Sequence, residues 1–144
     1  LKTANIMCDR KLNIFLIDFN CVTYNNTHSN LVEYGTEIFL SPQVILNKTN
    51  CYKLYSNDIW AFGLIVYQII SGINCNEYIS KTDKPNLRNF LFNYIISKGE
   101  KTFDLKELFF GTDEIIDKYI PIINKCFTFN SKTRITIEDI VKMI

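Results

Sequence analysis

Residues 5–17 contain two short apolar runs separated by a polar break, which is the pattern of a β-hairpin. The runs are Asn-Ile-Met-Cys at 5–8 and Asn-Ile-Phe-Leu-Ile at 13–17, and Asp-Arg-Lys at 9–11 lies between them. Short runs rich in β-branched and aromatic residues and bounded by turn residues favour strands over helices. Because the second run ends abruptly in Asp18, we expect its strand to deliver this carboxylate to the rim of the sheet.

The pattern changes after the hairpin. Residues 20–31 are polar and lack periodicity, so we expect a loop there, and loops of this length in compact domains are usually functional. Residues 58–70 are apolar on nearly every helical face, which predicts the buried central helix. Asn57 is expected to cap the start of this helix, and Ser71-Gly72 is expected to end it.

The last third of the chain predicts further helices. Residues 85–97 repeat apolar positions at the spacing of one helical face, and Gly99 follows as a stop. Another helix is expected from residue 112, where Pro121 leaves two alternatives: one kinked helix to Phe127, or a new start near Pro121. Thr136 with an acid three residues later predicts a capped terminal helix. The predicted fold class is mainly α with a short N-terminal β-hairpin.

Composition narrows the class of protein. A chain of 144 residues with 47% hydrophobic and 22% charged residues can form one domain with a real core. A net charge of +1 and apolar runs of about a dozen residues argue against nucleic-acid binding and against membrane association. The five scattered cysteines and one histidine predict reduced thiols without a disulfide framework or a zinc site. We therefore expect a cytoplasmic protein.

Four short motifs follow one another in a characteristic order. They are Leu-Lys-x-x-Asn at 1–5, Leu-Ile-Asp-Phe at 16–19, Ser-Pro-Gln at 41–43 and Asp-Ile-Trp-Ala-Phe-Gly at 58–63. In this order and spacing they resemble the C-terminal, large lobe of a serine/threonine protein kinase catalytic domain. The resemblance covers essentially residues 1–144, which would be a partial kinase domain with a protein-kinase-like large-lobe fold.

The resemblance implies a chemical role for four residues. Asn5 and Asp18 would bind the Mg²⁺ ions that bridge the phosphates of ATP, because amide and carboxylate oxygens are hard ligands. Lys2 would steady the transferring phosphoryl group, and Thr36 would pack against Lys2 in the loop that positions the substrate. The implied reaction is transfer of the ATP γ-phosphate to serine or threonine hydroxyls of a protein substrate.

The resemblance also implies structural roles. Asp58 would accept hydrogen bonds from the backbone of the catalytic loop, and Trp60 and Gly63 belong to the same motif. Pro42 lies in the anchor at the end of the activation segment. The next residue, Gln43, would pair with Arg134 near the end of the domain.

Two positions depart from the family pattern. Asn20 stands where the family has Gly, and Asn is one of the few residues that can adopt the positive φ expected there. Gln43 replaces a Glu, so its contact with Arg134 should lose the charge-assisted part and be weaker, but not absent.

The motifs of the small, ATP-binding lobe and the catalytic Asp do not occur in this sequence. We therefore expect the chain to be a fragment that is inactive by itself. An alternative interpretation is a pseudokinase or truncated kinase-like module that acts as a scaffold or binding partner. Asn20 and Gln43 lean slightly toward that alternative, whereas the four residues with implied chemical roles lean against it.

Overall fold

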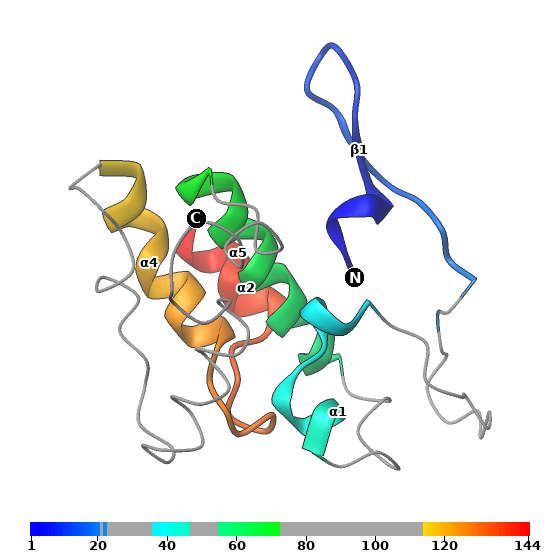
Figure 1. Cartoon of the computed structure of the whole chain (residues 1–144). Coiled ribbons are helices and arrows are strands. Elements are labelled where there is room, and N and C mark those ends of the chain that lie inside the picture. Colours follow the sequence, from blue (N-terminus) through cyan, green and yellow to red (C-terminus); the bar gives the residue numbers. More distant parts are fainter. Residues whose placement is uncertain (21, 23–35, 47–54, 73–113) are drawn as a thin grey trace, which may run out of the picture.

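The computed structural model describes residues 1–20, 22, 36–46, 55–72 and 114–144 (Figure 1). In chain order, these residues form the elements η1 (Thr3–Asn5), β1 (Ile6–Cys8), β2 (Ile14–Leu16), η2 (Glu37–Phe39), α1 (Pro42–Leu46), α2 (Ser56–Ser71), α4 (Glu114–Cys126) and α5 (Ile137–Met143). The predicted helix at 85–97 and most of the predicted loop at 20–31 lie outside the described residues. The described residues are mostly helical with a two-stranded sheet, which confirms the predicted fold class.

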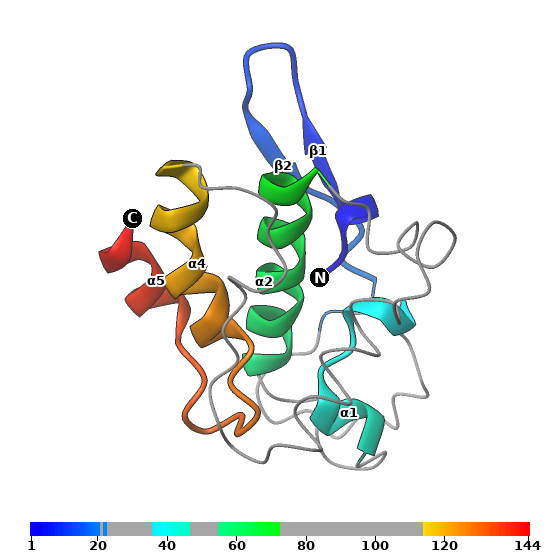
Figure 2. The ribbon, with the colours of Figure 1, turned by 60° about the vertical axis from the view of Figure 1, so that its left-hand side comes forward.

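The N-terminal hairpin has the predicted position. β1 and β2 pair antiparallel, with Ile6 opposite Leu16 and Cys8 opposite Ile14. At the tip the Leu12 amide donates to the Asp9 carbonyl at 3.0 Å, and Leu12 has a φ of 65°. A type I turn followed by a left-handed residue is a common three-residue hairpin connection. Both views show the hairpin extending away from the helices (Figures 1 and 2).

The core lies between α2 and the segment around the end of α4, which run side by side in Figure 2. Trp60 of α2 packs against Phe127 with ring centroids 4.9 Å apart and planes inclined by 57°. Leu64 and Tyr67 are each 1% exposed in the same cluster. The prediction of a buried central helix is confirmed, although Ile69 near its end is exposed.

Gly63 lies at a tight contact between α2 and the end of α4. A Cβ atom added to Gly63 would lie 2.6 Å from the Cβ of Cys126 and 3.1 Å from the Phe127 ring. Real Cβ atoms do not approach another carbon so closely, so any side chain at this position would push the helices apart. The close packing explains why glycine occupies this position of the motif.

The two ends of α2 differ from each other in how well the sequence predicted them. Gly72 ends the helix with a φ of 65°, as predicted. The expectation that Asn57 caps the helix is wrong, because Tyr55 is the N-cap residue and makes no side-chain cap bond. Asn57 lies inside the first turn, and its Oδ1 accepts a hydrogen bond from Ser41 Oγ at 2.7 Å. The Asn57 side chain thus bonds to Ser41, which is distant in sequence, and does not cap the helix.

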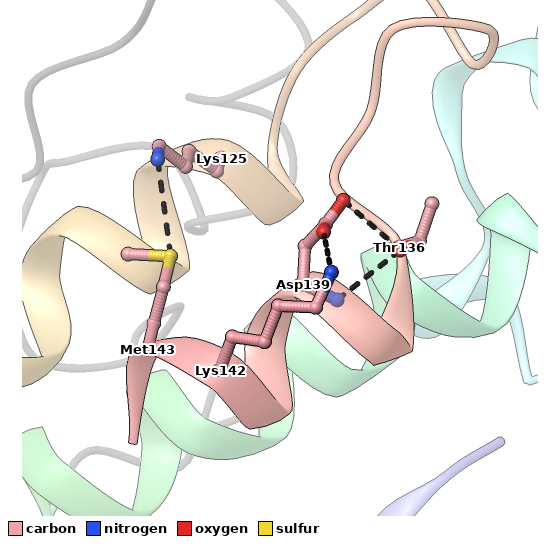
Figure 3. A network of polar contacts seen from close by, with 5 residues as sticks. All are labelled: Lys125, Thr136, Asp139, Lys142 and Met143. Atoms are coloured by element: carbon pink, nitrogen blue, oxygen red, sulfur yellow. Dashed lines mark hydrogen bonds and ion pairs between the residues drawn. The ribbon is translucent and has the colours of Figure 1, made fainter.

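The structure decides between one helix through Pro121 and a new helix that starts near it. α4 is one helix that contains Pro121, and Pro121 is exposed, where water can replace the hydrogen bond that proline removes. The Asp139 amide donates to Thr136 Oγ1 at 3.2 Å, which confirms the capped start of α5 (Figure 3). Among the described helices, none has the combination of length and hydropathy needed to cross a bilayer.

Candidate functional site

The hairpin brings the two predicted metal ligands to the same end of the sheet. The Ile17 amide donates to the Asn5 carbonyl at 2.9 Å, one step beyond the Ile6 and Leu16 pair. Asn5 is therefore opposite Ile17, and Asp18 follows immediately. Asn5 is half-buried and Asp18 is exposed. Residues 13 positions apart in the sequence thus lie at the same, open end of the hairpin.

Asp18 itself has an unusual backbone conformation. Its φ is 60°, and Leu12 is the other non-glycine residue with a positive φ in the described ranges. Asp is one of the few residues that visit this left-handed region without a large cost. Asn20 does not use its tolerance of positive φ: the turn in which the Val22 amide donates to the Phe19 carbonyl forms without it. The chain changes direction one residue after Ile17, at the predicted ligand.

The donor chemistry at this end of the hairpin fits Mg²⁺. Asn5 offers an amide oxygen and Asp18 a carboxylate, and both are hard ligands. No group of three or more His, Cys, Asp and Glu side chains comes together in the described part of the chain. Mg²⁺ commonly takes one or two protein ligands and completes its octahedron with water and phosphate oxygens. Two protein ligands therefore suit a Mg²⁺ ion that arrives with a nucleotide.

Lys2 and Thr36 each lie just before a short 3-10 helix. Lys2 is half-buried, and its carbonyl accepts the Asn5 amide at 3.0 Å. Thr36 is exposed, and its carbonyl accepts the Phe39 amide at 2.9 Å. No hydrogen bond joins the Lys2 and Thr36 side chains, both of which belong to the described residues. Their predicted contact stays a prediction.

Asp58 connects the N-terminal segment to the helical core. The Leu1 amino nitrogen lies 2.7 Å from Asp58 Oδ1, across 57 positions of sequence. Asp58 belongs to the first turn of α2. This contact places the backbone just before Lys2 against the central helix. The donor here is the amino group of Leu1, and the role implied for Asp58, accepting from backbone amides of the catalytic loop, stays a prediction.

The predicted pair Gln43 and Arg134 is also brought together. Arg134 Nη2 donates to Gln43 Oε1 at 2.7 Å, across 91 positions of sequence. The same guanidinium donates to the carbonyls of Ser56 at 2.6 Å and Thr128 at 2.9 Å, and it lies 5.2 Å from the centre of the Trp60 ring. One side chain therefore ties α1, the start of α2 and the loop before α5 together. Pro42, which begins α1, is fully buried beside this anchor.

The Arg134 anchor is a buried charge without a carboxylate partner in the described part of the chain. Arg134 is 4% exposed, and this burial lowers its pKa to about 10. Gln43 Nε2 also donates to the Phe129 carbonyl, so both ends of the Gln43 amide are used. Burial raises the pKa of Cys126 to about 12, so this thiol stays protonated and acts as a packing residue.

Sequence reasoning missed the backbone acceptors of Arg134. A guanidinium carries five N–H donors, which is more than one Gln side chain can accept. That excess signals that carbonyl groups must complete the site. It could not signal which ones, because Ser56 lies 78 positions from Arg134.

Comparison with known proteins agrees with the geometry. The family model described as "Protein kinase domain" matches residues 1–144. The chain is 26% identical over 144 residues to "Serine/threonine-protein kinase GIN4" of Saccharomyces cerevisiae, covering 99% of this chain and 11% of that protein. It is 28% identical over 131 residues to "Calcium-dependent protein kinase 3" of Plasmodium yoelii yoelii, covering 90% of this chain and 21% of that protein. It is 30% identical over 87 residues to human "3-phosphoinositide-dependent protein kinase 1", covering 55% of this chain and 15% of that protein.

The chain thus spans between 11% and 21% of the length of these relatives. The match to the family model, by contrast, runs along the whole chain. The chain therefore belongs to the protein kinase family.

Proposed function

We propose that this chain is the large-lobe part of a serine/threonine protein kinase catalytic domain. The complete domain would transfer the γ-phosphate of ATP to serine or threonine hydroxyls of a protein substrate inside the cell. The observation that carries this proposal is the hydrogen bond from Ile17 to the Asn5 carbonyl, because it brings Asn5 to the same end of the hairpin as Asp18. The relatives named as serine/threonine kinases support the choice of acceptor.

Each predicted residue has a part in this reaction. Asp18 and Asn5 would hold Mg²⁺ against the phosphates of ATP, and the bound ion would neutralise charge that develops during transfer. Lys2 would place a cation beside the transferring group. Thr36 would position the substrate hydroxyl through the loop in which it lies.

Asp18→Ala in the complete protein tests the proposal. Phosphate transfer from labelled ATP to a generic protein substrate should fall by about 10²–10³-fold or more. The reason is that the Mg²⁺ ion, which would neutralise the charge of the transition state, would lose its carboxylate ligand. Asp139→Ala is the matched control, since it removes an exposed carboxylate on the far helix α5 (Figure 3). Asn20→Gly should keep or raise the activity. Transfer by Asp18→Ala at the parental rate would refute the proposal.

The alternative interpretation, a kinase-like scaffold, predicts a different result. The parent protein would then transfer no phosphate at any Mg²⁺ concentration, and Asp18→Ala would leave partner binding unchanged. Gln43 and Asn20 were the sequence features that leaned toward it. The neutral amide of Gln43 still accepts from Arg134 at 2.7 Å, so this departure alone does not break the anchor.

A further inference from the structure

The carboxylate of Asp9 organises the tip of the hairpin. Its Oδ1 accepts the Lys11 amide at 2.8 Å and the Asn13 amide at 2.9 Å. Its Oδ2 accepts the side-chain amide of Asn13 at 2.8 Å. The hydrogen bond from the Asn13 side chain is the main cause that lowers the Asp9 pKa below its usual 3.8, so the group is ionised at neutral pH. A single exposed side chain thus fixes both ends of the turn.

Apart from the backbone ladder, side-chain burial adds little to hold the strands in register. Met7 is 55% exposed and Phe15 51% exposed, and in the described part of the chain the sheet contains two strands. Ile6 is the strand residue that packs against the helical core. A two-stranded hairpin is marginally stable in water by itself. Leu12 adds a cost, because a bulky side chain at positive φ is strained.

The tip of the hairpin and the candidate metal site lie at opposite ends of the paired strands β1 and β2. From Asp9 the pairing runs through Cys8 opposite Ile14 and Ile6 opposite Leu16 to the Ile17 amide on the Asn5 carbonyl. A slip or fraying that begins at the tip would therefore change the position of Asn5 relative to Asp18. A shift of register by one residue turns every side chain to the other face of a sheet.

We propose that Asp9 is a positioning residue for the metal site: by closing the tip, it keeps the strands in register and so holds Asn5 and Asp18 where one nucleotide-bound Mg²⁺ ion can meet both. This inference rests on the proposed kinase function. In this proposal Asp9 does not contact the substrate or the metal. Its effect passes along the backbone pairing of the hairpin.

The test follows two quantities in the complete protein. One is the Mg²⁺ concentration that gives half-maximal phosphate transfer, and the other is hydrogen-exchange protection of the Ile17 amide. Asp9→Ala should raise the half-maximal Mg²⁺ concentration about three- to tenfold, as expected for the loss of local hydrogen bonds. The rate at saturating Mg²⁺ should change little. Protection of the Ile17 amide should fall, whereas protection of the α2 amides should stay at the parental level.

Asp139→Ala is the matched control. Asp139 is also an exposed carboxylate whose pKa is lowered by local hydrogen bonds, but it lies on α5. Its replacement should change neither quantity. Equal shifts in Asp9→Ala and Asp139→Ala would mean that any loss of surface charge has this effect, and the proposal would be wrong.

Leu12→Gly is an independent test that leaves Asp9 in place. Glycine removes the cost of the positive φ, so this change alone should increase Ile17 protection and lower the half-maximal Mg²⁺ concentration. Combined with Asp9→Ala, it should restore part of both quantities. A general structural defect would not be rescued in this way, and an absence of rescue would count against the proposal.

Asp18→Ala separates this inference from the proposed function. If Asp18→Ala leaves the Mg²⁺ response unchanged, the proposed function itself fails. If Asp18→Ala removes the response while Asp9→Ala moves neither quantity, the proposed function stands and the role of Asp9 is refuted.

Discussion

The helical core and the N-terminal hairpin are held together in opposite ways. In the core, Tyr67 and Ile123 are each 1% exposed, and the Arg134 side chain joins segments 91 positions apart. In the hairpin, Met7 and Phe15 are more than half exposed, and the ordering hydrogen bonds connect near neighbours in sequence. The core therefore supplies the stability, whereas the candidate chemistry lies on a locally ordered segment.

Within the described residues, two contacts illustrate how the regions meet. Leu1 contacts Asp58 at the start of α2, and Ile6 packs against the core. Because the two regions are ordered by different interactions, changes in the core should alter unfolding more than the Mg²⁺ response. Three changes in the core test how far this separation holds.

Arg134→Ala should have the largest effect on stability. It leaves the Gln43 amide and the carbonyls of Ser56 and Thr128 without their donor. Unpaired buried polar groups should lower the free energy of unfolding by about 2–4 kcal/mol, measured by urea denaturation with hydrogen exchange in α2.

Arg134→Lys is the control for charge alone. Lysine keeps the cation but lacks the planar fork, so we expect it to recover only a minor part of the loss. Full recovery would show that charge, and not hydrogen-bond geometry, holds the anchor.

Gly63→Ala should come next. The new methyl group would meet Cys126 at 2.6 Å, and overpacking of this kind costs about 1–3 kcal/mol of unfolding free energy. The half-maximal Mg²⁺ concentration of the complete protein should stay at the parental value while the unfolding midpoint falls. A change in the Mg²⁺ response as large as that of Asp9→Ala would break the separation between the regions.

Gln43→Glu should have the smallest effect, and with the opposite sign. A carboxylate would pair with the buried guanidinium of Arg134, but the N–H bond to the Phe129 carbonyl would be lost. We expect a net gain of about 0.5–1 kcal/mol at neutral pH. The pairing should depress the pKa of the new carboxyl group, so the gain should be present above the unfolded value of about 4.3 and vanish as the pH falls through the folded value.

Gln68→Glu is the matched control for this substitution. The Oε1 atom of Gln68 is buried and has no hydrogen-bond partner among the described residues. The same change of amide to carboxylate should therefore destabilise the protein there. Stabilisation at both positions would show that a general effect of charge, and not Arg134, is responsible.

The sequence by itself determined the features that depend on neighbouring residues. The hairpin followed from two apolar runs around Asp9, and the start of α5 followed from Thr136 and Asp139, because strand pairing at a turn and helix capping are short-range. Gly72 marked the end of α2 for the same reason. The Gln43 and Arg134 contact was also predicted, but through the family resemblance and not from local physics.

The tertiary structure decided what depends on distant partners. Asn57 was expected to cap α2, but Ser41 engages its side chain from another segment. Pro121 could have ended a helix, yet α4 continues through it, and its neighbours Ile120 and Ile122 are buried in the core. The carbonyls around Arg134 have no residue signature at all. Each of these outcomes depends on free energy from groups that lie far apart in sequence, and a local pattern contains no information about where such groups meet.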